Sequence, residues 1–372
     1  MRPLTVLHAA QPTDAGVARY VAAATVDQLT RGWRVVVACP SGGQLAAELT
    51  AHGVPRLPWP ATRSPGVDSV AETQRLRRLI SQVDPDVVHL HSAKAGLAGR
   101  LAVRGARPTL FQPHGWSWLA ARGATARGAL AWERFAARWT DVCVCAGDGE
   151  AAHARHRGVG TRHAVVRNGV DLAHFAPAGE QARAAARDRL GIGQDVPLAV
   201  CLGRITRQKG QDVLVAAWPQ VRQHCPAALL SIVGDGDLLP TLRAATQPGV
   251  RFAPPVTDPR PWYAAADVVV LPSRWEGLSL TLLEALASGC SVVVSDIPGL
   301  VEAVTAGAGA RVPAGDACAV GQALARRLTD PDRCAAEGRA AARAASAFDV
   351  CRTHEQLAAV TSRIAHIVKM SA

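Results

Sequence analysis

Two glutamates, Glu276 and Glu284, lie eight positions apart around the expected start of a helix. The apolar run 267–272 predicts a buried strand, Glu276 and Gly277 follow it in a short loop, and the helix is expected to open at Ser279. At such a junction in a parallel sheet, free backbone N–H groups and the positive helix end favour an anion such as a phosphate. Carboxylates beside an anion are repelled unless they accept hydrogen bonds from hydroxyl groups. The pair therefore predicts a ligand that carries both phosphate and sugar.

A pair of cations occupies the same kind of position after another strand. The strand 197–205 ends in Gly203 and Arg204, and Lys209 with Gly210 opens the next helix. Two positive side chains and a helix amino terminus suit a diphosphate, since each charge-assisted hydrogen bond contributes roughly 1.5–3 kcal/mol. Taken alone, these residues fit two solvated surface cations beside a turn equally well. The glutamate pair in the same half of the chain favours the diphosphate interpretation.

The turn Val233-Gly234-Asp235-Gly236 ends a further strand of this half. Its glycines permit a tight turn and a close approach of backbone or ligand. Asp235 is expected to cap a helix that begins at 237. The turn is interpreted as architectural, and a contact with the ligand is left open.

The first half offers weaker signals. The loop 11–17 contains Gly16 and precedes a helix, which predicts a second backbone-lined helix start, although a simple turn fits as well. His114 ends a strand, so its imidazole is expected to project into a cleft between the two halves, where a catalytic or a structural role is open. His89 and His91 alternate on one strand and face one way, which favours packed, hydrogen-bonded side chains.

The segment 115–139 is rich in tryptophan and arginine. Residues at helical spacing, expected to face the core, are Trp132, Phe135, Ala136 and Trp139. Trp116 and Trp118 lie beside His114 and do not fit that face. They favour core packing or the wall of an acceptor pocket, while a basic, tryptophan-bearing rim in the headgroup region of a membrane is the alternative.

Composition limits the class of protein. The chain has 372 residues, of which 49% are hydrophobic and 19% charged, so it is globular and long enough for two domains. No apolar run approaches the ~18 residues that cross a bilayer, and the apolar start is short for a secretory signal, so a cytoplasmic protein is expected. The net charge of +11 favours an anionic partner such as a nucleotide, a nucleic acid or an anionic membrane. The nine cysteines lack zinc-site spacing and no Asp-rich pair occurs, so no metal is expected.

Short apolar runs alternate with helical patterns throughout, which predicts an α/β fold with parallel sheets. The expected strands are 4–9, 34–40, 86–92, 108–114, 141–147, 163–169, 197–205, 227–236, 250–253, 267–273 and 291–297. They form two series, which predicts two doubly wound, Rossmann-like domains facing each other across a cleft. The expected divisions are an amino-terminal domain (1–175), a linker (176–195), a second domain (196–348) and a final helix (349–372) that packs back on the first domain.

Together these motifs resemble the family 4 retaining glycosyltransferases, which have the GT-B fold. The residues that carry the resemblance are HSAKAGLAGRLA (91–102), the HG at 114–115, VVRNGVDLAHF (165–175), GRITRQKG (203–210), VGDG (233–236) and EGLSLTLLEALASG (276–289). The resemblance covers nearly the whole chain in the family's order. Its most specific part is the element from Glu276 to Glu284.

The resemblance implies a role for each candidate residue. Arg204 and Lys209, next to Gly203, would bind the diphosphate of a nucleotide-sugar donor, while Glu276 would hold hydroxyls of the transferred sugar and Glu284 the ribose. The backbone amides that would cradle phosphate and sugar belong to Gly277, Leu278, Ser279 and Leu280. The resemblance implies catalytic roles for four residues, which are His114, Arg204, Lys209 and Glu276.

In the amino-terminal domain, the resemblance implies that Gly16 belongs to the donor-facing loop and that His114 lies near the donor sugar and the reaction centre. Members of the family often have paired glycines in this loop, whereas Ala15 precedes Gly16 here. That departure affects how closely the backbone can approach a phosphate.

The expected activity is therefore metal-independent, retaining transfer of a hexose from a UDP- or GDP-sugar to a glycan, lipid-linked or small-molecule acceptor. Such an enzyme needs no cofactor, contributes to polysaccharide or glycolipid assembly, and acts in the cytoplasm or at the inner face of the membrane as a peripheral protein. A nucleotide-sugar hydrolysing epimerase and a glycan phosphorylase on the same fold are the alternatives. A nucleic-acid partner is not expected, because it would not explain carboxylates beside a phosphate site.

Overall fold

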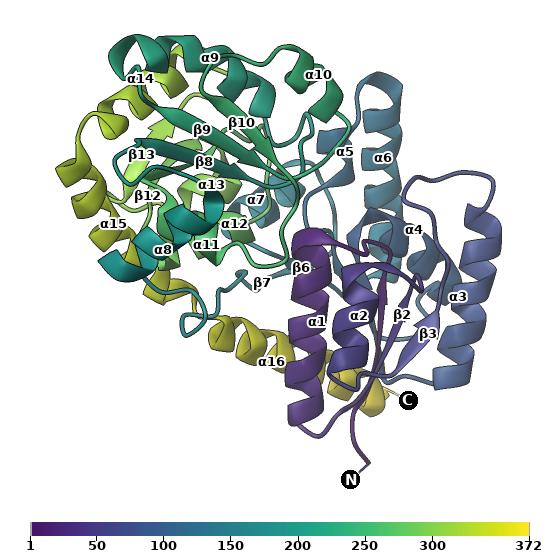
Figure 1. Cartoon of the computed structure of the whole chain (residues 1–372). Helices are drawn as coiled ribbons and strands as arrows, with labels where there is room; N and C mark the ends of the chain where they lie inside the picture. The colour runs from purple at the N-terminus through teal and green to yellow at the C-terminus, as the bar shows by residue number, and fades with distance from the viewer. Residues whose placement is uncertain (1, 372) are drawn as a thin grey trace. The chain divides into compact units, whose positions relative to one another are not determined.

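The computed structural model describes residues 2–371, with side chains up to residue 366. The chain forms two compact units, each with its own parallel sheet (Figure 1). The first unit runs to Arg167 and takes up the chain again from Arg352, and the second unit is Asn168–Cys351.

The sheet of the first unit has seven strands in the order β3-β2-β1-β4-β5-β6-β7. Every pair of neighbours is parallel, as short strands joined by crossover helices require. The order reverses between β1 and β4, the position at which open α/β sheets bind ligands. The strands are β1 (Thr5–Ala10), β2 (Arg34–Cys39), β3 (Arg56–Pro58), β4 (Val87–His91), β5 (Thr109–Gln112), β6 (Val142–Cys145) and β7 (Arg162–Val165).

Helices cover both faces of this sheet and are α1 (Ala15–Thr30), α2 (Gly43–Ala51), α3 (Ser69–Val83), α4 (Ser92–Val103), α5 (Ser117–Ala120), α6 (Gly123–Ala136), the 3-10 turn η1 (Ala137–Trp139), α7 (Asp148–His156) and α16 (Val350–Ser371). One face packs against α1 and α16, which contribute Val21 and Leu357 to the core. The opposite face packs against α3, α4 and α7. Because both faces are buried, the strands are almost continuously apolar. The final helix thus returns to the core of the first unit.

The sheet of the second unit has six parallel strands in the order β10-β9-β8-β11-β12-β13 and reverses between β8 and β11. The strands are β8 (Leu198–Leu202), β9 (Leu229–Val233), β10 (Val250–Ala253), β11 (Val268–Leu271), β12 (Ser291–Ser295) and β13 (Gly309–Val312). Its helices are α8 (Glu180–Leu190), α9 (Gln211–His224), α10 (Leu239–Ala244), α11 (Arg260–Ala265), α12 (Leu280–Ala287), α13 (Pro298–Val301), α14 (Ala317–Leu328), α15 (Pro331–Ala345) and the 3-10 turn η2 (Ser346–Phe348). Both sheets therefore have the doubly wound order expected of Rossmann-like domains.

Two edge strands were not predicted. β3 has three residues and β13 has four, and both are only partly buried. An edge strand that is short and half-exposed lacks the long apolar run that marks a buried parallel strand. The helical-spacing argument for α6 is also corrected, because Phe135 is 44% exposed and the helix ends at Ala136.

The segment expected as a linker, 176–195, contains helix α8, which is anchored within the second unit. Arg187 on this helix is 1% exposed and donates to the carboxylate of Asp267 at 3.0 Å. Its guanidinium also donates to four backbone carbonyls, those of Ala265, Gly193, Gln194 and Val196. A buried cation with this many partners fixes the helix to the sheet. An Ala- and Arg-rich sequence does not reveal such a role, because the same composition fits a solvated helix.

The Arg187→Met variant is expected to lower the free energy of unfolding of the second unit by about 1–3 kcal/mol, because the backbone carbonyls lose their buried donor, whereas Asp267 keeps Arg183 as a cation. Arg189→Met is the matched control, since Arg189 is exposed on the same helix. Urea denaturation of both variants measures the difference. Equal stability of the two variants would contradict the structural role of Arg187.

Candidate active site

The candidate site of the second unit lies where the strand order reverses. The loop 203–210 follows β8 and the loop 272–279 follows β11, and these two strands are neighbours in the sheet. Lys209 Nζ lies 2.6 Å from Glu276 Oε1, which joins the two loops by an ion pair. The side chains keep 17% and 8% of their surface exposed, so the pair is mostly buried but still reached by solvent.

The carboxylate of Glu276 has two further donors. Ser273 Oγ donates to the same oxygen as Lys209 at 2.8 Å, and Gln208 Nε2 reaches the other oxygen at 3.5 Å. Arg204 Nη2 donates in turn to Gln208 Oε1 at 3.3 Å. The structure thus brings Arg204, Lys209 and Glu276 into one polar network. Gln208 and Ser273 complete it, and sequence reasoning did not single them out.

Further contacts hold these loops at close range, among them the hydrogen bond of 2.8 Å from the Arg274 amide to the Gln208 carbonyl. Arg274 donates to both oxygens of Asp212 at 2.8 and 2.6 Å and fixes the start of α9. Gly299, at the start of α13, packs on the loop that carries Glu276. A Cβ at Gly299 would lie 1.7 Å from the carbonyl oxygen of Gly277, so no larger residue fits without moving this loop.

The turn Val233-Gly234-Asp235-Gly236 supports the cation loop. Gly203 N donates to the Val233 carbonyl at 3.0 Å, and a Cβ at Gly234 would lie 2.1 Å from the carbonyl oxygen of Gly203. Asp235 Oδ1 accepts from the Gly236 amide at 2.7 Å and does not cap α10, which begins at Leu239. The close approach of two backbones explains the glycines and agrees with the architectural interpretation.

The start of α12 has the expected form. Ser279 is its N-cap and accepts from the Leu282 amide at 3.4 Å, so the helix opens directly after the Glu276 loop. Gly277, Leu278 and Leu280 complete this junction. The buried side chain of Asn168 donates to the Leu278 carbonyl at 2.7 Å and so holds the loop from the other side.

Glu284 lies one turn further along α12 and is 4% exposed. Its Oε2 accepts from the hydroxyl of Tyr263 at 2.8 Å. The contact of Glu284 with a ribose, which the resemblance implies, stays a prediction. In the structure this carboxylate already has a protein partner. Tyr263 is a neighbour that only the folded chain reveals.

In the first unit, Gly16 lies in the first turn of α1, which begins at Ala15, and not in a loop. Ala15 has φ of 64°, a left-handed conformation that glycine adopts without the cost that a side chain imposes. The position before Gly16 thus has glycine-like geometry although it holds alanine.

His114 follows β5 in a left-handed turn with φ of 52°, and Gly115 follows with φ of 103°. The buried carboxylate of Glu150 fixes this turn, since it accepts from the Gly115 amide at 2.6 Å and from the Ala146 amide at 2.7 Å. Trp116 and Trp118 beyond the turn are 2% and 7% exposed and stack on each other, so they belong to the core. They offer no exposed aromatic rim.

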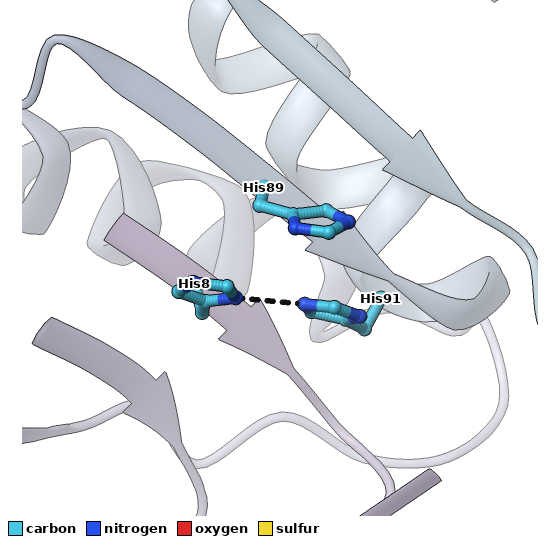
Figure 2. A group of neighbouring side chains, drawn as sticks. All are labelled: His8, His89 and His91. Carbon is cyan, nitrogen blue, oxygen red and sulfur yellow. Dashed lines mark hydrogen bonds between the residues drawn. The ribbon is translucent and has the colours of Figure 1, made fainter. Parts of the chain in front are cut away.

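Three histidines of the first unit cluster at the reversal point between β1 and β4. His8 Nδ1 and His91 Nε2 lie 2.9 Å apart, and Figure 2 shows this hydrogen bond with His89 above the pair. All three are 0% exposed, and their nearest ligand atoms lie within 4.8 Å of one another. The ring centroids of His89 and His91 lie 4.0 Å apart, and the ring planes make an angle of 34°. Because imidazole lone pairs lie in the ring plane, this stacking and the His8–His91 bond favour the packed role over a metal triad.

Burial keeps these three histidines and the neighbouring His114 neutral. It lowers the pKa of His8 to about 4 and that of His114 to about 3. Burial, together with the neighbouring histidines, also holds the pKa values of His89 and His91 well below the ordinary 6.5.

The free energy of unfolding should therefore fall as the pH decreases from about 6.5 towards 4. The unfolded chain binds protons near pH 6.5 while the buried histidines do not, so each histidine contributes a slope of up to about 1.4 kcal/mol per pH unit. Hydrogen exchange of β1 and β4 amides at pH 7.5 and 5.5 measures the effect. His89→Gln should reduce the slope, and an unchanged slope in this variant would count against the account.

Among the described residues, no helix is long and apolar enough to span a bilayer.

Two family models match the chain. The model described as Glycosyltransferase Family 4 matches residues 15–174, and the model described as Glycosyl transferases group 1 matches residues 196–330.

Curated relatives agree with these models. The chain is 36% identical over 288 residues to a GDP-mannose-dependent alpha-(1-6)-phosphatidylinositol monomannoside mannosyltransferase of Mycolicibacterium smegmatis, covering 71% of this chain and 72% of the relative. It is 35% identical over 292 residues to the protein of the same name from Mycobacterium tuberculosis, with 72% of each chain covered.

Among solved structures, Anabaena Alr3699/HepE in complex with UDP-glucose matches with a TM-score of 0.83 at 20% identity, over 97% of this chain and 100% of that chain. This likeness concerns the fold, which is the two-domain α/β fold of GT-B glycosyltransferases. The family models, the relatives and the fold agree, and the chain belongs to the family 4 (group 1) glycosyltransferases.

Proposed function

We propose that this glycosyltransferase moves a hexose from a nucleotide-diphosphate sugar to an acceptor with retention of the anomeric configuration. The observation that carries the proposal is the Lys209–Glu276 ion pair at the reversal point of the second sheet, beside the start of α12. A cation and a carboxylate held 2.6 Å apart match the two halves of such a donor, which carries phosphates next to sugar hydroxyls.

Binding of the donor would exchange partners in this network. The diphosphate would take Lys209 and Arg204 as its cations, and Glu276 would turn its oxygens to hydroxyls of the sugar. Ser273, which already donates to Glu276, would keep that carboxylate in place during the exchange. Such pre-positioned charges stabilise the negative charge that develops on the leaving phosphate, the term expected to dominate catalysis.

The retaining step would be a same-face substitution. The bond from the anomeric carbon to the leaving phosphate breaks, the acceptor oxygen bonds to the same face, and the departing phosphate accepts the acceptor's proton. His114 would lie near the sugar at this step. Two cations and a helix amino terminus supply the positive charge for the leaving group, which supports catalysis without a metal or cofactor.

GDP-mannose is the donor that we propose to test first, because the two mycobacterial relatives are named for it. The same names support a lipid-linked glycan as the acceptor class. We place the reaction in the cytoplasm, at the inner face of the membrane as a peripheral enzyme in glycolipid or polysaccharide assembly. Nucleic acid has no place in this reaction.

Lys209→Met should lower kcat at least ~100-fold, because the leaving diphosphate would lose one of its two proposed cations. Release of GDP from GDP-mannose in the presence of a phosphatidylinositol mannoside acceptor measures the rate, with UDP-glucose as the alternative donor. Arg207→Met is the control, since it removes an exposed positive charge from the same loop. A near-normal rate for Lys209→Met would contradict the proposal.

Two further properties of the product and the reaction are expected. An α-linked donor should give an α-linked product, as seen by proton NMR, and EDTA should leave the rate unchanged because protein cations neutralise the diphosphate. A β-linked product or loss of activity with EDTA would refute the corresponding part of the mechanism.

A further inference from the structure

A continuous chain of hydrogen bonds runs through the first unit from helix α1 to the turn after β5. Gln28 Oε1 lies 2.8 Å from His8 Nε2, His8 Nδ1 lies 2.9 Å from His91 Nε2, and His91 Nδ1 lies 3.0 Å from His114 Nε2. Gln28, His8 and His91 are each at most 1% exposed. Three hydrogen bonds thus connect the buried amide of Gln28 to His114 at the strand end.

The histidine rings are oriented so that their nitrogen atoms can form these hydrogen bonds. His8 and His91 lie with an interplanar angle of 10° and centroids 5.2 Å apart, and His91 and His114 with 25° and 5.3 Å. Nearly coplanar rings at this separation meet edge to edge, so the nitrogen lone pairs point along the chain of bonds. Tyr20 lies edge-on to His114 at 5.0 Å and restricts the last ring.

Each link of this chain needs one proton, and a neutral histidine carries one. If the Gln28 oxygen accepts from His8, then His8 must accept from His91, and His91 must accept from His114. All three rings carry the proton on Nε2. The Nδ1 of His114 is then left with a lone pair. If the amide of Gln28 were reversed, every proton would move to the other nitrogen and Nδ1 of His114 would become a donor.

We infer that Gln28, His8 and His91 are positioning residues that fix the tautomer of His114, so that its Nδ1 accepts a hydrogen bond from a substrate hydroxyl. Nδ1 of His114 is the hydrogen-bond acceptor, and the donor is a hydroxyl group of a sugar or of a glycan. The link to substrate rests on the proposed function, in which His114 lies near the sugar, whereas the tautomer itself rests on the contacts within the first unit.

The tautomers are directly observable. Histidine-labelled whole protein, studied by two-bond proton–nitrogen NMR at pH 8.5, should show His8, His91 and His114 protonated on Nε2, with signals assigned from single His→Asn variants. A proton on Nδ1 of His114 would overturn the inference. In Gln28→Met, which removes the amide at nearly constant volume, His114 should show both tautomers. A single unchanged tautomer there would also overturn it.

Kinetics test the link to substrate. Gln28→Lys places only a donor beside His8, should reverse the tautomers and should lower kcat at least tenfold with a smaller change in KM. Gln28→Glu offers only an acceptor at pH 8.5 and should recover most of that loss. Equal losses in the two variants would show a merely structural role. Thr25→Val, a buried change on the same helix, controls for altered packing of α1.

The two proposals fail in different ways. If the wild-type protein turns over neither GDP-mannose nor UDP-sugars, the proposed function is wrong, while the NMR spectrum still decides the tautomer. If turnover is normal and His114 carries its proton on Nδ1, the relay is wrong and the transferase activity stands.

Discussion

Parallel pairing is the constraint on which both units depend. In a parallel sheet every strand ends at the same edge, so loops far apart in the chain meet there. In the second unit this brings Lys209, from the loop after β8, to 2.6 Å from Glu276, from the loop after β11. In the first unit it brings His8 of β1 next to His91 of β4. Each contact lies where the strand order reverses, and each joins residues that are far apart in the sequence.

The two edges have opposite electrostatic character. The second unit concentrates charge, with Lys209, Arg204 and Glu276 in one network near the positive end of α12. The histidines at the edge of the first unit are neutral, because burial lowers the pKa values of His8 and His114 to about 4 and about 3. A charged edge suits a diphosphate and a neutral, hydrogen-bonding edge suits hydroxyl groups, which agrees with the proposed transfer from a nucleotide sugar to a hydroxylated acceptor.

Much of the fold and the charged site could be predicted from sequence, because long apolar strands and the motif from Glu276 to Glu284 are local patterns. The short strands β3 and β13 were not predicted, because half-exposed edge strands lack a long apolar run. The anchoring of α8 by Arg187 escaped because its partner, Asp267, is 80 positions away. The burial of Trp116 agrees with the favoured interpretation, core packing, and leaves the membrane-facing alternative without a basis.

The order of residues alone determined two parallel α/β units, the family, and the identity of the cations and carboxylates at the strand ends, because periodicity and short motifs are properties of neighbouring residues. Tertiary structure decided which of them touch. It paired Lys209 with Glu276, gave Glu284 the hydroxyl of Tyr263, and aligned Gln28 with the histidines. Hydrogen bonds act only over about 3 Å, and closeness on that scale between distant residues is set by packing, which no local pattern contains.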